Sequence, residues 1–465
     1  MMMNKDVGVA EVSHAYLIEA AERAVPIGYK QTGVGVIPED WLVLSISENH
    51  QVATGNTPPP SDKSNYGESY LFASPADLGE KKNIYQTEKM LSLKGFALSR
   101  RFPAGSTLFT CIGSTIGKTG YACFDLTSNQ QINAVFPNLN NDSHFTYYAL
   151  TYLAPRVKVL AGEQAVPLVN KTEFGETKYP LPSTKIEQTA IANALSDVDA
   201  LLSELEKLIA KKQAIKTATM QKLLTGRTRL PQFALRKDGS VKGYKQSELG
   251  EVPEDWSVLT LGDVGKFKNG INKSADDFGY GSPFVNLMDV FGKPSISCIE
   301  NLGLINSTDL EKKEYSLEKG DILFIRSSVK PTGVGLTSVV LNELTETVYS
   351  GFLIRFRSGG KLEINFKKYC FYDEGFRKRI ISGSTVSANT NINQDVLKAI
   401  PIAFPSSVKE QTAIATILSN MDEEIQALEQ RLSKTRQIKQ GMMQELLTGR
   451  TRLLQLSAKV AGQSY

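Results

Sequence analysis

Two long stretches of the chain repeat the same spacing of apolar residues. Apolar side chains recur alternately four and three residues apart, and mostly polar residues stand between them. A period of 3.5 residues keeps these side chains on one line and predicts a helix that pairs with another helix. Each stretch ends in Leu-Leu-Thr-Gly, with a glycine suited to close the helix at Gly226 and Gly449. The apolar positions are Ile191, Leu195, Val198, Leu202, Leu205 and Ile209, then Ile414, Leu418, Met421, Ile425, Leu428 and Leu432.

The two predicted helices have matching lengths, and we expect them to pair with each other. From Glu187 to Leu224 the first would run about 57 Å, at 1.5 Å per residue. If a pseudo-two-fold axis relates the halves, the pair is antiparallel, and a globular domain lies near each end of this rod. The alternative is that each helix packs separately against its own domain.

The remaining sequence shows patterns of both strands and helices. Short apolar runs after a glycine, at 105–114 and 320–329, predict strands, and residues 347–357 alternate as a strand does. Residues 145–161 and 365–382 are amphipathic and rich in aromatic side chains, which predicts helices. The expected fold class is α+β, with two α/β domains separated by two long helices paired as an antiparallel coiled coil.

The whole chain is an internal duplication. GYKQTGVGVIPEDWLVLSI at 28–46 returns as GYKQSELGEVPEDWSVLTL at 243–261, and residues 181–230 return at 404–453. Between these shared segments the two halves diverge almost completely. We divide the chain into an N-terminal helical extension (1–27), a first domain (28–182), a central helical spacer and linker (183–242), a second domain (243–405), and a C-terminal helical spacer with its tail (406–465).

Composition places the chain among soluble globular proteins, with 41% hydrophobic and 22% charged residues. It contains no long apolar run and no signal-peptide pattern, so we expect a cytoplasmic protein without contact to a membrane. The four cysteines form no CxxC pair and only three histidines are present, so we expect no metal site and no histidine-based catalysis. A net charge of +4 permits binding to nucleic acid but does not by itself predict it.

The segment CIGSTIGKTG at 111–120 is similar to a phosphate-binding loop. Such a loop needs four residues between its two glycines, and only three stand between Gly113 and Gly117. The second half carries FIRSSVKPTGVG at the matching place, without Gly-Lys-Thr. We therefore interpret the segment as a variable loop, and a nucleotide hydrolase built on Lys118 remains the weaker enzymatic hypothesis.

Basic and polar residues in the predicted loops are candidates for contacts with nucleic acid. Arginine and lysine can bind guanine edges or phosphates, and serine can bind a phosphate or a base edge. The strongest candidates follow the two matched strands, because there the sequence differs between the halves at one place in a shared pattern. The candidates are Lys63, Tyr66, Arg100, Arg101, Ser114 and Lys118 in the first domain, and Lys273, Arg326, Ser328 and Lys330 in the second.

The repeated motifs resemble those of the specificity subunit of type I restriction–modification systems. The motifs are IPEDW and VPEDW, the strand segment from Pro103 to Phe109, the EQTAIA segments and the LLTGRTRL ends, and the resemblance covers residues 28–453. It implies that each domain reads one half of a split, asymmetric site in double-stranded DNA. It also implies that the coiled coil spaces the halves and docks two methyltransferase subunits, through which restriction and translocase subunits join.

On this resemblance the chain itself catalyses nothing and holds no cofactor. S-adenosylmethionine, ATP and Mg²⁺ are expected on the partner subunits, which are separate or fused proteins. The apolar positions of the two helices are then expected to form the coil seam and the subunit interface. The alternative hypothesis is a coiled-coil scaffold whose two domains bind proteins, and near-neutral charge keeps that alternative open.

Overall fold

Both helices predicted at the shared segments are present, each 40 residues long: α6 (Lys185–Leu224) and α13 (Val408–Leu447). The computed structural model describes residues 25–162 and 165–453. Most of the expected N-terminal extension (1–27) and the tail after residue 453 therefore lie outside the described residues. Two units divide the chain: unit 1 comprises Met1–Leu205 and Arg431–Tyr465, and unit 2 comprises Glu206–Gln430.

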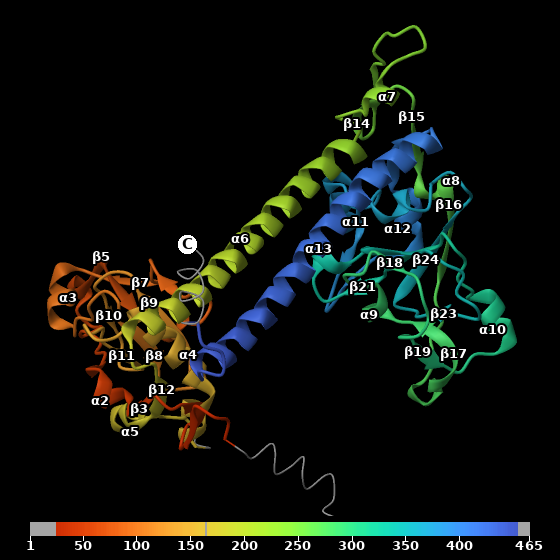
Figure 1. The fold of residues 1–465 in the computed structure, drawn as a ribbon. Helices are drawn as coiled ribbons and strands as arrows, with labels where there is room; N and C mark the ends of the chain where they lie inside the picture. The colour runs from red at the N-terminus through yellow and green to blue at the C-terminus, as the bar shows by residue number, and fades with distance from the viewer. Residues whose placement is uncertain (1–24, 163–164, 454–465) are drawn as a thin grey trace, which may run out of the picture. The chain divides into compact units, whose positions relative to one another are not determined.

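Each unit contains one variable domain together with part of α6 and part of α13 (Figure 1). Unit 1 contains β1 (Tyr29–Thr32), β2 (Gly35–Pro38), β3 (Leu42–Ser45), α2 (Ile46–Asn49), β4 (Val52–Thr54), η1 (Lys63–Asn65), β5 (Tyr66–Ala73), η2 (Pro75–Asp77), β6 (Asn83–Ile84), β7 (Lys89–Leu91), α3 (Leu93–Leu98), β8 (Thr107–Thr110), β9 (Thr119–Ala122), β10 (Thr127–Ser128), β11 (Ile132–Val135), α4 (Ser143–Leu160), α5 (Lys171–Glu176) and β12 (Lys178–Leu181).

Unit 2 follows a similar order of elements and adds a three-stranded sheet of its own. It contains α7 (Pro231–Ala234), β13 (Tyr244–Ser247), β14 (Gly250–Pro253), β15 (Trp256–Thr260), α8 (Leu261–Val264), β16 (Gly265–Asn269), η3 (Ala275–Asp277), β17 (Phe278–Val285), α9 (Leu287–Val290), β18 (Ser295–Ile296), β19 (Gly303–Ile305), α10 (Asp309–Glu314), β20 (Ile322–Ile325), β21 (Ser327–Ser328), η4 (Pro331–Gly333), β22 (Thr337–Val340), β23 (Val348–Tyr349), β24 (Leu353–Ser358), η5 (Phe366–Lys368), α11 (Glu374–Gly383), β25 (Thr385–Val386), β26 (Thr390–Asn391), α12 (Gln394–Ala399) and β27 (Pro401–Pro405).

The two domains share one sheet topology. A five-stranded sheet has the order β4-β11-β8-β9-β6 in unit 1 and β16-β24-β20-β22-β18 in unit 2. A three-stranded sheet, β10-β5-β7 or β19-β17-β23, accompanies it in each unit. The strands predicted after the matched glycines are β8 and β20, and their four residues are fully buried. The α+β fold class is thereby confirmed.

One predicted helix differs from the structure. Residues 145–161 form a single helix, α4, as expected, but residues 365–382 form the short turn η5 and then α11. The Asp373 carboxylate accepts a hydrogen bond from the Phe376 N–H and caps α11. Since a capping aspartate offers the backbone an alternative to continued helix, the helix begins anew at Glu374.

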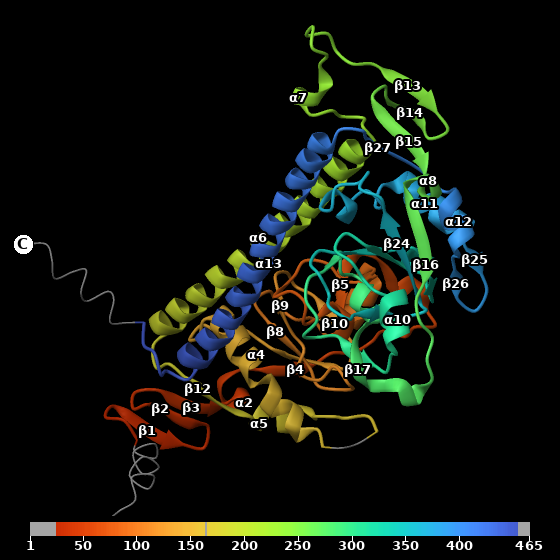
Figure 2. The same cartoon turned by 90° about the vertical axis from the view of Figure 1, so that its right-hand side faces the viewer.

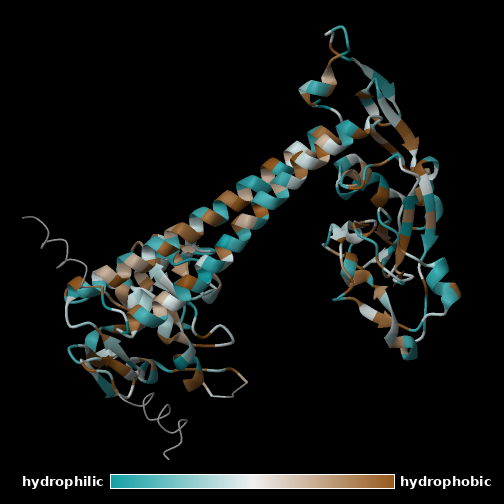
Figure 3. Ribbon diagram, turned by 45° about the vertical axis from the view of Figure 1, so that its right-hand side comes forward, coloured by the Kyte–Doolittle hydropathy of each residue, from teal (hydrophilic) through white to brown (hydrophobic). Residues whose placement is uncertain are grey.

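Within each unit the parts of α6 and α13 lie side by side in opposite directions (Figures 1 and 2). In unit 2 the Lys212 ammonium lies 2.6 Å from Glu424, and Lys216 pairs with Asp422. In unit 1 the Lys439 ammonium lies 2.6 Å from Asp199. Figure 3 shows polar and apolar residues alternating along both helices. The predicted antiparallel pairing is thus confirmed.

Candidate nucleic-acid interface

Four candidates of the first domain gather around η1 and α3. Lys63 is exposed on η1, and the Tyr66 hydroxyl donates to the Pro58 carbonyl at 3.2 Å. Both arginines after α3 are exposed: Arg100 donates to the Thr54 carbonyl, and the Arg101 guanidinium lies 4.8 Å from the centroid of the Phe96 ring. Lys63, Arg100 and Arg101 thus place three basic side chains around η1 and α3, and bonds to nearby backbone carbonyls hold Tyr66 and Arg100 in position.

The other two candidates of the first domain lie in the turn between β8 and β9. Ser114 is exposed at the tip, while the Lys118 ammonium donates to the Pro75 carbonyl at 3.3 Å. A phosphate-binding loop would continue from its Gly-Lys-Thr into a helix. Here Thr119 begins strand β9 instead. The geometry therefore agrees with the interpretation of 111–120 as a variable loop.

Three candidates of the second domain follow strand β20, as their spacing predicts. Arg326 and Ser328 are half-buried, whereas Lys330 is exposed at the start of η4. Ser328 pairs with Thr390 between β21 and β26, so the loop is braced by a small sheet. Lys273 lies elsewhere, with its ammonium 2.8 Å from the Glu311 carboxylate.

The two domains correspond residue by residue around these loops. The Cys111 N–H donates to the Gln131 carbonyl in the first domain, and the Arg326 N–H donates to the Phe352 carbonyl in the second. The Thr110 and Ile325 N–H groups likewise donate to the carbonyls of Lys118 and Leu336. The Gly117 and Gly335 N–H groups donate back to the carbonyls of Thr110 and Ile325, which leaves residues 111–116 in the first loop and 326–334 in the second. The loop of the second domain is therefore longer.

The repeated motifs meet at one junction in each unit. In unit 2 the Arg229 guanidinium, which follows α6, binds Glu410 at the start of α13 at 2.7 Å and Asp255 at 2.9 Å. In unit 1 Arg452 binds Glu187 and, at 2.9 Å, Asp40 in the same manner. Each arginine also lies 5.9 Å from the ring centroid of the neighbouring tryptophan, Trp256 or Trp41. The Pro-Glu-Asp-Trp, Glu-Gln and Arg-Thr-Arg motifs therefore recur because they build one structure twice.

At each junction the arginine holds one aspartate in its charged form. The hydrogen bond from Arg452 lowers the pKa of Asp40, and the paired Asp40 and Glu187 raise the pKa of Arg452. At the second junction burial opposes ionisation of Asp255, but the bonds from Arg229 and Lys242 still leave its pKa lowered. Asp40 and Asp255 therefore remain ionised throughout the neutral pH range.

A second pair of polar clusters fixes each domain to the coil. The Tyr148 hydroxyl donates to Asp199 at 2.6 Å in unit 1, and the Tyr369 hydroxyl donates to Asp422 at 2.9 Å in unit 2. Unit 1 alone adds Lys82, whose ammonium donates to the hydroxyls of Tyr148 and Ser196 at 3.0 and 2.9 Å. Burial lowers the pKa of Lys82 to about 8.

The seam positions of the two helices serve two purposes. Ile191 and Leu195 pack into the core of unit 1, and Ile414 and Leu418 pack into the core of unit 2. Towards the middle of the helices the seam continues through residues that are buried or half-buried. These are Val198, Leu202 and Leu205 in α6, and Met421, Ile425 and Leu428 in α13.

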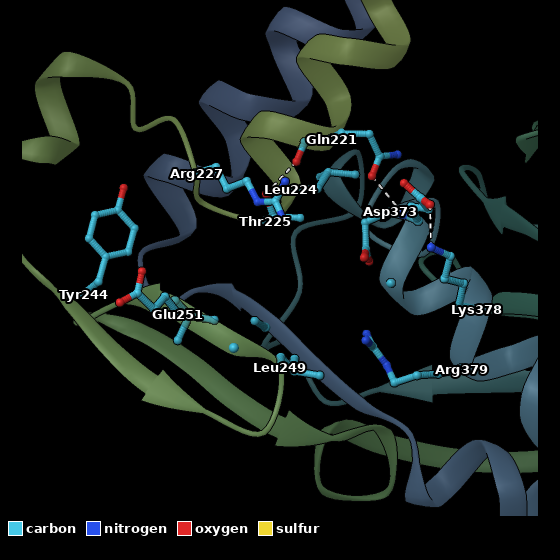
Figure 4. Close-up of a pocket in the computed structure, with 15 residues that line it drawn as sticks. Gln221, Leu224, Thr225, Arg227, Tyr244, Leu249, Glu251, Asp373, Lys378 and Arg379 are labelled. Carbon is cyan, nitrogen blue, oxygen red and sulfur yellow. Dashed lines mark hydrogen bonds and ion pairs between the residues drawn. The ribbon is translucent and has the colours of Figure 1, made fainter.

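A cavity of about 670 Å³ lies in unit 2 where α6 ends (Figure 4). The Gln221 amide binds the Tyr372 carbonyl and the Glu374 N–H, and Lys378 pairs with Glu374 at 2.6 Å. Arg379 points into the cavity, which also contains Asp373 (Figure 4). The mixture of signs favours no anionic ligand, and the variable loops remain the candidate interface.

The junction arginines Arg229 and Arg452 were not predicted from the sequence. Their signal was present, since Arg-Thr-Arg-Leu recurs at both helix ends together with Pro-Glu-Asp-Trp. Exposed apolar side chains of the second domain, among them Met288 and Phe352, were not predicted either. These come from separate segments, so only the fold brings them together.

The described residues contain no group of side chains that could hold a metal ion. Across the same parts of the chain, none of the helices is long and apolar enough to cross a membrane.

Comparison with known proteins identifies the family. Residues 38–217 and 253–438 match the family described as type I restriction modification DNA specificity domain. The specificity subunit of the type I restriction enzyme MjaVIII of Methanocaldococcus jannaschii is 24% identical over 428 residues, covering 90% of this chain and 95% of that protein. The MjaIX specificity subunit of the same organism is 26% identical, covering 62% of this chain and 66% of its own length.

The fold agrees with that family. The crystal structure of the type I restriction–modification S subunit of M. genitalium matches with a TM-score of 0.50 and 18% identity, covering 88% of this chain and 96% of that one. The chain belongs to the type I restriction–modification DNA specificity family. This confirms the resemblance and the expectation that the chain supplies DNA sequence specificity rather than catalysis.

Proposed function

We propose that the chain reads a split and asymmetric DNA site, one half with each variable domain. The observation that carries the proposal is the contrast between the sheets, which the two domains share, and the loops, in which they differ. The five-stranded sheets have the same order and the same hydrogen-bond register, while the turn after β8 and β20 differs in length and sequence. Two readers on one scaffold with different loops are suited to two different short sequences.

In the first domain, the proposed contacts are Lys63, Tyr66, Arg100 and Arg101 around α3, with Ser114 at the neighbouring turn. In the second domain they are Arg326, Ser328 and Lys330. Exposed arginine and lysine side chains can neutralise phosphates or bind guanine edges. Lys118 and Lys273 are weaker candidates, because each already has a partner in Pro75 or Glu311.

The paired helices α6 and α13 are proposed to set the separation of the half-sites and to dock two methyltransferase subunits. These partners would bring S-adenosylmethionine, methylate adenine at N6, and recruit the ATP-driven restriction subunits. The repetition of the junction supports two equivalent docking places, because Glu187 with Arg452 and Glu410 with Arg229 give the coil the same local structure in both units.

The test is methylome sequencing of a host that expresses this chain with its neighbouring methyltransferase, compared with the methyltransferase alone. We expect a new N6-methyladenine motif in two unlike parts separated by unspecified bases. If a complex shown to assemble produced no new motif, the proposal would fail, and a protein-binding scaffold would be favoured.

The spacer function has a test of its own. Inserting four residues at matched places in the middle of both α6 and α13 lengthens each helix by about 6 Å. We expect the unspecified gap to grow by about two base pairs, at roughly 3.4 Å per pair, with both half-sites unchanged. A motif with an unchanged gap would show that the helices do not set the spacing.

A further inference from the structure

The second domain exposes an unusual group of apolar side chains around a cavity of about 510 Å³. Met288 is 70% exposed, Phe291 47%, Val329 81% and Phe352 57%. Met288 lies on α9 and Phe291 directly follows it, Val329 lies in the loop 326–334, and Phe352 directly precedes β24. Leu336 lines the same cavity. We call Met288, Phe291, Val329, Leu336 and Phe352 the apolar face.

The first domain carries small or polar residues at the corresponding places. β5 pairs with β10 as β17 pairs with β23, and capping boxes follow at Ser74 and Asn286. Counted from these anchors, Ala76 corresponds to Met288 and Gly79 to Phe291.

Hydrogen bonds between strands identify the residues of the first domain that correspond to Phe352 and Leu336 of the apolar face. Gln131 corresponds to Phe352, and Lys118 corresponds to Leu336. A Cβ atom on Gly79 would lie 3.0 Å from the Lys118 side chain, so the lysine stem covers the place where the second domain has Phe291. One surface in a duplicated fold is thus polar in one copy and apolar in the other.

This difference argues against a protein partner common to both domains. Large exposed apolar patches generally mark binding sites. A methyltransferase that docks at both halves would need residues that both halves share, as the two junctions do. The residues at this surface differ between the two domains, as expected if each domain binds its own short DNA sequence.

The chemistry of the face specifies which base it would contact. In the major groove the C5-methyl group of thymine is the apolar group on a base edge, and apolar side chains recognise it. The cavity is also lined by Ser328 and Asn389, which can bind polar base edges, and by Lys330, whose exposed ammonium can reach a phosphate.

We infer that the apolar face of the second domain reads the methyl group of at least one thymine in the half-site of that domain. The inference rests on the proposed function and adds the chemical feature that is recognised. Phe352 and Met288 provide the contact, and the loop 326–334 positions Val329 beside them. The corresponding surface of the first domain, with Gln131 and the stem of Lys118, offers no such apolar contact.

The test uses the assembled complex with its methyltransferase subunits and the split site found by methylome sequencing. Replacing thymine by uracil removes only the C5-methyl group, one position at a time. We expect the dissociation constant to rise about fourfold at a contacted thymine of the second half-site, as for one methyl-sized group returned to water.

Variants connect this sensitivity to the face. Phe352→Gln and Met288→Ala introduce the residues of the first domain at exposed positions, so the fold is retained. We expect both variants to bind the thymine and uracil duplexes about equally. The matched control is Leu310→Ala, since Leu310 is 73% exposed on α10 and lies outside the face. The control should keep the fourfold preference for thymine.

Three results would overturn the inference. The first is a second half-site without an A·T pair, and the second is binding that is indifferent to uracil at every thymine. The third is a Phe352→Gln complex that keeps its preference for thymine but loses methyltransferase subunits. The last would assign the face to a protein partner. A split motif with uracil-indifferent binding overturns this inference alone, whereas the absence of any split motif overturns the proposed function as well.

Discussion

The two domains share their interiors and differ at their surfaces. Phe109 and Phe324 occupy the same place in the central strand and are fully buried, and Trp41 and Trp256 fill matching cores. Directly before the neighbouring strands, Gln131 corresponds to Phe352 and Lys118 to Leu336. The comparison separates residues that maintain the fold from residues that are free to change the target.

The two junctions belong to the interior structure that both domains share. A buried arginine between two carboxylates tolerates little change, because removing one partner leaves an uncompensated charge. The loops after β8 and β20 contain no such buried ion pair, and their residues Ser114, Val329 and Lys330 are exposed. The sequences of the two domains therefore diverge most at residues that take part in no buried network.

The largest effect is expected when the difference between the domains is removed. Replacing residues 243–405 by a second copy of 28–182 gives a chain with two identical readers in the same frame. We expect the recognised motif to become palindromic, with both parts equal to the half-site of the first domain. Methylome sequencing measures this directly, and a motif that stays asymmetric would contradict the assignment of one half-site to each domain.

The two junction arginines should differ in their contribution to stability. The Arg229 side chain is 7% exposed and its partner Glu410 is 3% exposed, whereas Arg452 is 25% exposed. We expect Arg229→Met to destabilise unit 2 by about 3 kcal/mol, because it leaves Glu410 buried and unpaired. Arg452→Met should destabilise unit 1 by about half as much. Glu187 is only 1% exposed, but the Trp41 Nε1–H still donates to its carboxylate at 3.3 Å.

The tryptophans report the two units separately. Trp41 and Trp256 are the protein's only two tryptophans, and one stands at each junction. Urea unfolding followed by fluorescence, in chains with Trp41→Phe or Trp256→Phe, assigns each transition to its unit. Equal losses for the two arginine variants would show that the hydrogen bond from Trp41 to Glu187 does not offset the loss of Arg452.

The glycines that end the two long helices should behave alike. Gly226 and Gly449 have φ values of +70° and +72°, and a Cβ on either would lie 2.5 Å from a proline, Pro253 or Pro38. We expect alanine at either position to destabilise its unit by about 2 kcal/mol, through left-handed backbone strain and the close contact. Gly441→Ala is the control, with open space around it in α13, and should stabilise by about 0.5–1 kcal/mol.

The smallest effect concerns pH and the lysine present in unit 1 alone. The folded-state pKa of Lys82 is about 8, below its ordinary value of 10.5, so the unfolded chain binds more protons between these values. Stability of unit 1 should therefore gain from this group as pH rises from about 8 to 10.5. Lys82→Met should lack this gain, measured as the change in the Trp41-reported urea midpoint between pH 7.5 and 9.5. A variant with an unchanged pH slope would contradict the lowered pKa.

Much of the fold that the two domains share could be predicted from the sequence, because each sequence motif occurs in both halves. The helices α6 and α13 carry strict heptad spacing and terminal glycines, and β8 and β20 follow matched glycine turns. The break before α11 was not predicted, since its cause is the local capping bond of Asp373. Periodicity alone does not reveal such a competing hydrogen bond.

The candidate site was predicted less completely. A search for basic residues finds Arg100 and Lys330, but it cannot tell that Lys273 is paired with Glu311. The apolar face was missed for a different reason. Met288, Val329 and Phe352 are far apart in the chain, and an isolated apolar residue in a sequence usually indicates core.

The junctions have a consequence for assembly. Glu187 begins the first long helix and Arg229 follows it, but each forms its junction with a partner from the other repeat, Arg452 or Glu410. A half-length chain spanning residues 28–242 therefore carries one acceptor and one donor that do not meet within that chain. Two copies can satisfy each other around a two-fold axis, so such a fragment is self-complementary and should form a homodimer. In this sense the duplicated protein is a fused dimer whose two protomers have since become free to diverge.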